Sequence, residues 1–259
     1  MERRFYAMRL WYEGGPFRGY QRQKGLPTVQ GALEQAMRRA GICAHLSAAA
    51  RTDAGVHALS QVVSFAVREA LDPEAFRREV NRSLPEGIAV LHVRPERRGF
   101  HARASALSRT YVYLVGAGLP EGLRPYAWSL PDGRAFPETK VESPDPKVMR
   151  AALSQSLGEH DFAGFSRFGS RRVRARRTLL RAEIHSASWV PLHAVVLEGN
   201  GFSRAMVRNL VGTVVAAGLG LERPGRVGEI LSAPTRYRGV RAPGSGLTLA
   251  AVSYPPSAA

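Results

Sequence analysis

The sequence contains two Asp-Pro pairs, Asp72-Pro73 and Asp145-Pro146, and each precedes a stretch with apolar residues at helical spacing. Aspartate is a favoured N-cap residue and proline fits the first turn, so each pair predicts the start of an α-helix. The apolar stripes are spaced by four residues: Phe76, Val80 and Leu84 in the first helix, Met149, Leu153 and Leu157 in the second. The same helix start thus occurs in each half of the chain, which favours two units of similar plan.

Strand-like segments surround these helices in both halves. Alternating or β-branched runs predict strands over 3–14, 60–67, 87–96, 108–116, 178–190, 192–202 and 246–255. Apolar periodicity predicts further helices over 27–41, 203–218 and 226–233. Each half therefore follows the order strand, helix, one or more strands, helix and strand.

This order predicts an α+β fold with two similar lobes, residues 1–105 and 106–259. Each lobe is expected to hold an antiparallel or mixed sheet with helices on one face. The opposite face of such a sheet stays open, an arrangement that is common in RNA-binding domains. The Pro- and Gly-rich segment 116–146 shows no convincing element, and we interpret it as a long insertion in the C-terminal lobe.

The chain is strongly basic, with 37 Lys and Arg residues against 21 Asp and Glu residues and a net charge of +16. Only Lys24, Lys140 and Lys147 are lysines, so arginine supplies nearly all of the positive charge. Guanidinium groups bind phosphate bidentately and stack on bases, which favours a nucleic-acid partner. A codon bias toward arginine is the alternative explanation. The five arginines of segment 168–180 are interpreted as an electrostatic track for phosphates.

The single cysteine, Cys43, excludes an intramolecular disulfide and a cysteine-based zinc cluster. A reducing, cytoplasmic setting is therefore expected. The N-terminus lacks the apolar region of a signal peptide, and no apolar run is long enough to cross a bilayer, so we expect a soluble protein. No acid pair or His-x-x-x-His motif occurs at metal-ligand spacing, so no metal site is predicted.

The stretch "AAARTDAGVHALSQVVSF" places one acid, Asp53, in a turn that leads into a strand. Arg51 and His57 lie within the same seven residues of a chain that is short of carboxylates. Asp53 is thus a candidate catalytic group, and the alternative is a tight Asp-Ala-Gly turn in which Asp53 only hydrogen-bonds its own backbone. No second acid is present here, so a two-carboxylate glycosidase arrangement finds no support.

Two further residues are candidates for contact with an anionic or aromatic ligand. Arg208 lies near the start of the helix predicted over 203–218, where a cation is unfavourable unless an anion compensates it. That anion is either a phosphate or a structural carboxylate. Tyr111 in the strand "SRTYVYLV" could stack on a base, or it could simply fill the core.

Several motifs, taken together, resemble the TruA family of tRNA pseudouridine synthases. They are "FRGYQRQKGLPTVQGALEQA", "ARTDAGVHALSQVVSF", "NRSLPEGIAV", "FHARASALSRTYVYLV", "LGEHDFAGFS", "GNGFSRAMVRNLVGTV" and "APGSGLTLAAVSYP". They occur in order along nearly the whole chain, and "RTDAGVHA" is the most specific. The sequence departs from the family pattern in two places: Thr248 replaces an aromatic residue, and Arg204-Ala205 replaces residues that are often histidines.

The resemblance implies an isomerase that converts uridine to pseudouridine in the anticodon stem-loop of tRNA, at positions 38 to 40, without cofactor or metal. It also implies a homodimer and a pseudouridine synthase fold whose two lobes form a basic cleft. Residue by residue, it makes Asp53 the catalytic nucleophile or base. Tyr111 would pack against the target base, Arg208 would pair with Asp53, and Arg51 would help to hold the flipped nucleotide.

Two other functions fit parts of the same sequence. A non-catalytic RNA-binding protein or tRNA-folding chaperone would show the same charge, although the retained Asp53, Tyr111 and Arg208 argue against it. A metal-dependent nuclease would need clustered carboxylates, and the sequence offers none near Asp53. The choice among uridines 38, 39 and 40, and between nucleophilic attack and removal of a sugar proton, stays open.

Overall fold

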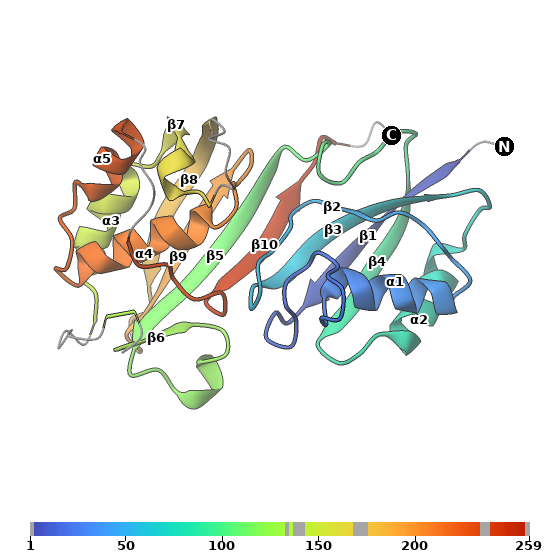
Figure 1. Ribbon diagram of the computed structural model, residues 1–259, viewed down its shortest axis with the longest axis horizontal. Coiled ribbons are helices and arrows are strands. Elements are labelled where there is room, and N and C mark those ends of the chain that lie inside the picture. Colours follow the sequence, from blue (N-terminus) through green and yellow to red (C-terminus); the bar gives the residue numbers. More distant parts are fainter. Residues whose placement is uncertain (1–2, 133–134, 137–142, 168–175, 234–238, 257–259) are drawn as a thin grey trace. The chain divides into compact units, whose positions relative to one another are not determined.

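The computed structural model describes residues 3–132, 135–136, 143–167, 176–233 and 239–256 of the 259-residue chain (Figure 1). The chain forms two compact units: unit 1 is Met1–Arg109 with Thr248–Ala259, and unit 2 is Thr110–Leu247. The chain first passes from unit 1 to unit 2 after Arg109, close to the predicted boundary at 105/106. The closing strand was assigned to the C-terminal lobe by the sequence analysis, whereas in the structure it pairs with a strand of unit 1.

Unit 1 is a mixed sheet with two helices on one face (Figure 1). Its strands are β1 (Arg4–Tyr12), β2 (Ser47–Ala48), β3 (His57–Val67), β4 (Ile88–Glu96) and β10 (Leu247–Ser253), and its helices are α1 (Val29–Arg39) and α2 (Pro73–Ser83). The strand order is β4-β1-β3-β10, and β2 also pairs with β3. Strand β1 is antiparallel to β3 and β4, whereas β10 runs parallel to β3.

The helix ends of unit 1 follow from their capping residues. The Thr28 hydroxyl accepts a hydrogen bond from the Gly31 N–H at 3.3 Å, and this cap starts α1. The Asp72 carboxylate accepts bonds from Glu74 and Ala75 at 2.9 and 3.0 Å, which confirms the Asp-Pro start of α2. These side chains satisfy amide groups that have no partner within the first helical turn.

Unit 2 repeats the plan with further strands of the same ten-stranded sheet and three helices. Its strands are β5 (Ser108–Ala117), whose first two residues lie in unit 1, β6 (Trp128–Leu130), β7 (Gly158–Asp161), β8 (Arg176–Ser186) and β9 (Leu192–Gly199). Its helices are α3 (Pro146–Ser154), α4 (Met206–Gly218) and α5 (Arg226–Ser232), with short 3₁₀ helices η1 (Glu121–Leu123) and η2 (Phe162–Phe165). The strand order is β5-β9-β8-β7, and β6 runs parallel to β5.

The three helices of unit 2 pack against one another on one face of its sheet (Figure 1). Helix α4 is buried on most sides, as its apolar sequence predicts. Asp145 caps α3 by accepting a bond from the Lys147 N–H at 2.7 Å, so the second Asp-Pro prediction is also confirmed. The α+β fold with one-sided helices is therefore present in both units.

The segment 116–146 contains more structure than the sequence analysis predicted. Helix η1 and strand β6 both lie within it. The Trp128 ring stacks on Phe136 at a centroid distance of 5.5 Å and meets Tyr113 edge-on at 6.3 Å. A buried tryptophan explains why three residues of strand form in a Pro-rich segment. None of the described helices is long and apolar enough to cross a membrane.

Candidate active site

Asp53 lies in a tight turn immediately before β3 in unit 1. The Val56 N–H donates a hydrogen bond to the Asp53 carbonyl oxygen at 3.2 Å, and Gly55 has a φ of +78° that favours glycine. The Asp53 residue is half-buried, while its neighbour Arg51 is exposed and Thr52 is buried. The backbone turn expected from the Asp-Ala-Gly sequence is present, and it leaves Asp53 partly open to solvent. We name residues 49–56 the catalytic loop, after the candidate catalytic residue Asp53 that the sequence analysis predicts.

The side chain of Gln61 fixes the backbone at the start of the catalytic loop. Gln61 is fully buried in β3. Its Oε1 accepts a hydrogen bond from the Ala50 N–H at 3.2 Å, and its Nε2 donates to the Ala50 carbonyl at 2.7 Å. One amide side chain thus satisfies both polar groups of one residue, in the manner of a strand neighbour. Ala50 precedes Arg51 directly, so the clamp restrains the loop close to the candidate catalytic group.

A second tether joins the loop to β1 through two hydroxyl groups. The Tyr12 hydroxyl lies 2.8 Å from the Thr52 Oγ1 and accepts a bond from the Gln61 Nε2 at 3.3 Å. Burial raises the pKa of Tyr12 to about 12, although its bonds to Thr52 and Gln61 oppose this shift. Tyr12 therefore stays neutral at ordinary pH, and its hydroxyl stays hydrogen-bonded to that of Thr52. Asp53 follows Thr52, so this tether ends one residue before it.

Two glycines let the segment between β1 and α1 approach the loop closely. A Cβ at Gly14 would overlap the Val56 carbonyl and lie 2.5 Å from the Gly55 carbonyl carbon. A Cβ at Gly19, where φ is +95°, would lie 3.0 Å from the Thr52 carbonyl oxygen. Main-chain contacts complete the support, because the Tyr20 N–H donates to Thr52 at 3.1 Å.

His57 and Arg109 support the two ends of the catalytic loop. At its C-terminal end, the Gly14 N–H donates to the His57 Nδ1 at 3.1 Å, so the ring hydrogen of this buried histidine lies on Nε2. At its N-terminal end, the buried guanidinium of Arg109 donates to the Ala49 carbonyl from Nε at 3.3 Å and from Nη2 at 3.2 Å. Both side chains hold backbone groups, which gives them a structural function.

The other two predicted site residues, Tyr111 and Arg208, belong to unit 2. Tyr111 in β5 is buried and meets the Phe202 ring edge-on at a centroid distance of 5.1 Å. Arg208 in the first turn of α4 is half-buried, and its Nε donates to the Ala242 carbonyl at 2.7 Å. Asp53 and Arg51 belong to unit 1, so the pairing of Asp53 with Arg208 stays a prediction.

The proposed phosphate track over 168–180 lies partly outside the described residues, which resume at Arg176 in β8. Arg176 pairs with Glu159 of β7 at 2.7 Å, an exposed ion pair. The described residues contain no group of three His, Cys, Asp or Glu side chains that could hold a metal ion.

The sequence analysis did not identify Tyr12, Thr52 and Gln61 as part of the site. Gln61 carries a recognisable signal, because it is a long polar side chain in a β-branched strand segment that is expected to be buried. A buried amide needs hydrogen-bond partners, and in this strand it finds them on the catalytic loop. Tyr12 carries no such signal, since an inward tyrosine in a strand usually fills the core.

The fold thus places one carboxylate, that of Asp53, on a turn that neighbouring side chains hold in place. Comparison with known proteins shows to which family a chain with this loop belongs. A family model described as tRNA pseudouridine synthase matches residues 12–103 and 152–255, so the chain belongs to this family of isomerases. The match confirms the family that the motifs indicated, and with it the pseudouridine synthase fold.

Individual relatives carry the name tRNA pseudouridine synthase A. The protein of Bordetella petrii is 39% identical over 256 residues, which cover 96% of this chain and 91% of the relative. The protein of Solibacter usitatus is 34% identical over 248 residues, which cover 95% of this chain and 97% of the relative. That of Neisseria gonorrhoeae is 41% identical over 83% of this chain and 78% of its own.

The Gln61 clamp leads to a prediction about stability. Substitution Gln61→Leu removes both bonds to Ala50 and leaves its N–H and carbonyl unpaired, so we expect a loss of about 1–3 kcal/mol in the free energy of unfolding. Urea denaturation measures it. The matched control Gln23→Leu removes one exposed bond to the Arg18 carbonyl and should change stability by less than about 0.5 kcal/mol. Equal losses in both variants would contradict the clamp.

Proposed function

We propose that this protein isomerises uridine to pseudouridine in the anticodon stem-loop of tRNA, at positions 38 to 40, with Asp53 as nucleophile or base on the flipped nucleotide. One observation carries the proposal: Asp53 is a half-buried carboxylate in a loop that Gln61, Tyr12 and two glycines hold from several sides. A preorganised group of this kind suits chemistry that depends on the position of one side chain.

The reaction requires little beyond one ionised carboxylate. The bond between N1 and C1′ breaks, the uracil turns, a bond forms between C5 and C1′, the hydrogen on C5 leaves as a proton, and N1 gains a proton from solvent. Asp53 either attacks C1′ or removes a sugar proton, and in both cases it is regenerated. The product is an isomer of the substrate and nothing is oxidised, so the proposed reaction needs no cofactor or metal.

The other site residues take roles that follow from the family motifs. A stem nucleotide must leave its stack to be reached, at a cost of a few kcal/mol. Arg51 is exposed beside Asp53 and is proposed to hold the flipped nucleotide. Tyr111 is proposed to pack against the target base, and Arg208 to stabilise the Asp53 carboxylate when the site excludes water. A homodimer, which depends on the resemblance alone, and a cytoplasmic location, which the single cysteine favours, complete the proposal.

Tritium release tests the proposal directly. Unmodified tRNA transcripts that carry tritium at C5 of uridine should lose tritium with the wild-type protein in the presence of EDTA. A matched transcript with cytidine at positions 38 to 40 should lose none, which separates the anticodon arm from other sites. Tight tRNA binding without release would instead favour a non-catalytic RNA-binding protein. Cleavage of the transcript that EDTA abolishes would favour a nuclease.

A further inference from the structure

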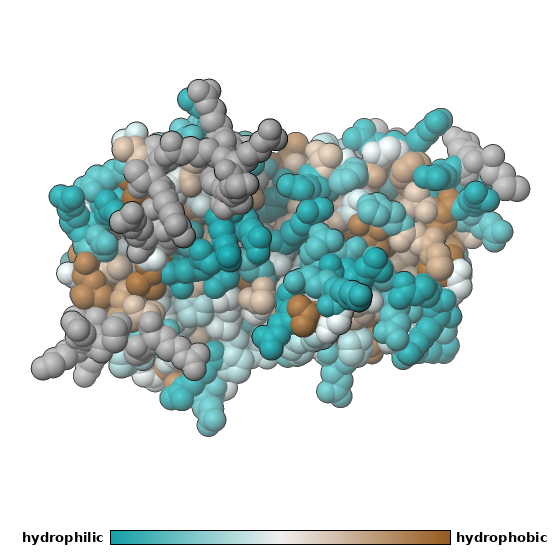
Figure 2. All heavy atoms as spheres, in the orientation of Figure 1, coloured by the Kyte–Doolittle hydropathy of each residue, from teal (hydrophilic) through white to brown (hydrophobic). Residues whose placement is uncertain are grey.

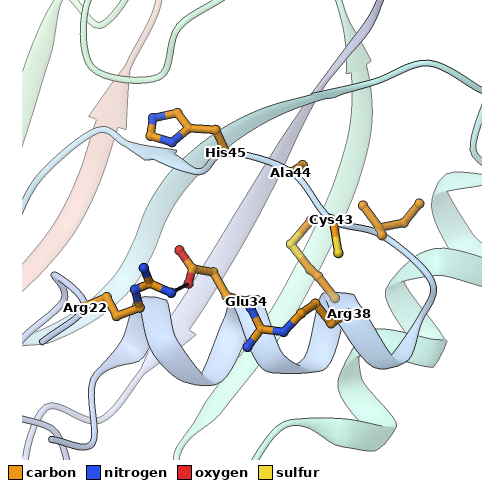
Figure 3. Close-up of a pocket in the computed structure, with 8 residues that line it drawn as sticks. Arg22, Glu34, Arg38, Cys43, Ala44 and His45 are labelled. Carbon is orange, nitrogen blue, oxygen red and sulfur yellow. Dashed lines mark ion pairs between the residues drawn. The ribbon is translucent and has the colours of Figure 1, made fainter. Parts of the chain in front are cut away.

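A pocket of about 230 Å³ lies in unit 1 between α1 and the segment that leads to β2 (Figure 3). Arg22, Glu34 and Arg38 line it along the helix side, and Cys43 and His45 face them from the neighbouring segment. Hydrophilic residues dominate the surface over α1 and α2 in Figure 2. The pocket is therefore an open, polar depression.

The charges in this pocket do not cancel. The Glu34 carboxylate accepts a hydrogen bond from the Gln30 Nε2 at 2.8 Å and forms an ion pair with the Arg22 Nη1 at 3.2 Å. Arg38 follows Glu34 by four residues, which is the spacing at which a glutamate and an arginine usually pair on a helix. Because Arg22 takes that carboxylate, Arg38 has no acidic partner among the residues that the structure describes.

The position of Arg38 at the end of α1 stabilises its positive charge in the absence of an acidic partner. Arg38 and Arg39 lie in the last turn of α1, where the helix dipole favours cations. The pocket thus holds two guanidinium groups but only one carboxylate, which pairs with Arg22. The Arg22 side chain is 64% exposed, so its remaining N–H groups are accessible to a ligand.

The pocket adjoins the catalytic loop. From His45 the chain passes through β2 into residues 49–56, and on the other side Tyr20 donates its N–H to Thr52 at 3.1 Å. Burial raises the pKa of Tyr20, and both Glu34 of the pocket and Arg51 of the loop act on that hydroxyl. The hydroxyl is buried, and no hydrogen-bond partner reaches it in the described part of the chain.

We propose that this pocket binds a backbone phosphate of the RNA substrate, from a nucleotide near the one that Asp53 acts on. The inference rests on the proposed function, because it takes RNA as the ligand. Paired guanidinium groups match the geometry and the charge of a phosphodiester. The exposed position of Arg22 and Arg38 suits a chain that runs across the surface. A phosphate held here would fix the register of the RNA at the catalytic loop.

Cys43 offers a test in the unaltered protein, because it is the only cysteine in the sequence, is exposed and lines the pocket. Alkylation by iodoacetamide should slow several-fold when saturating unmodified tRNA transcript is present. Inorganic phosphate at the same ionic strength should leave the rate unchanged, which separates an RNA phosphate from a free anion. An unchanged alkylation rate with tRNA bound would overturn the proposal. Equal slowing by inorganic phosphate would show that the pocket binds a free anion and would overturn an RNA phosphate as its ligand.

A pair of adjacent arginines gives the second test. Arg38→Ala should weaken tRNA binding and lower the slope of log affinity against log salt by about 0.7–0.9, the value for one phosphate contact. Arg39 lies in the same helical turn and is exposed but does not line the pocket, so Arg39→Ala should keep the wild-type slope. If Arg38→Ala kept the wild-type slope in a protein that still forms pseudouridine, phosphate binding in the pocket would be overturned and the proposed function would stand. Absence of tritium release by the wild type would contradict the proposed function instead.

Discussion

Substitution of Asp53 by asparagine is expected to lower the rate of pseudouridine formation by about three orders of magnitude or more, because the amide can neither attack C1′ nor accept a proton. The side chain keeps its size and half-buried position, so the fold and the affinity for tRNA should stay close to wild type. Tritium release measures the rate, and filter binding measures the affinity for the same transcript.

A matched charge control separates chemistry from electrostatics. Glu86→Gln removes one negative charge from an exposed position in unit 1, and its rate should equal that of the wild type. If Asp53→Asn retained near wild-type release, Asp53 would not be the catalytic group. If it lost tRNA binding together with activity, the carboxylate would have a structural function in the loop.

Substitution Gly14→Ala is expected to lower kcat by about 10- to 100-fold, because a displacement of about 1 Å at a catalytic group has effects of this size. The new methyl group would overlap the Val56 carbonyl and press on Gly55, the two residues that close the Asp53 turn. The turn must move, whereas no group that contacts RNA is removed. Steady-state kinetics should therefore show a fall in kcat with a nearly unchanged KM.

Gly15 provides the control for this substitution. It is the next residue, it is exposed, and a Cβ there would meet nothing within 4 Å. Gly15→Ala should leave kcat and stability near the wild-type values. A similar loss in both variants would show that flexibility of the glycine pair matters, and contact with the turn would then be the wrong explanation.

Most elements were predictable from local patterns, because each carries its own signal. The Asp72 and Asp145 caps, the Thr28 start of α1 and the alternation of β5 are properties of a few neighbouring residues. Strands of two to four residues, such as β2, β6 and β7, were missed because so short a segment shows no period. They form where neighbouring strands or a buried ring, such as Trp128, supply the stabilisation.

The candidate site was predictable only in part. The Asp-Ala-Gly turn and its charged neighbours are contiguous in sequence, so Asp53 and Arg51 could be chosen as candidates directly. The supports of the loop come from residues far apart in the chain: the Tyr12–Thr52 bond spans 40 residues and the Tyr12–Gln61 bond spans 49. Such contacts depend on which strands lie next to each other, and the spacing of apolar residues within one segment does not reveal this.

The position of β10 has a consequence for synthesis on the ribosome. This strand pairs with β3 beside His57, yet it is translated only after the whole of unit 2. The Ser108–Ser253 hydroxyl bond at 2.6 Å and the Tyr254 bond to the Ala102 carbonyl at 2.7 Å form equally late. A nascent chain that has released unit 1 up to Arg109 therefore exposes an unpaired edge of β3 next to the catalytic loop. That edge is completed only once β10 has been synthesised, so chaperones that recognise open strands have the whole synthesis time of unit 2 in which to act.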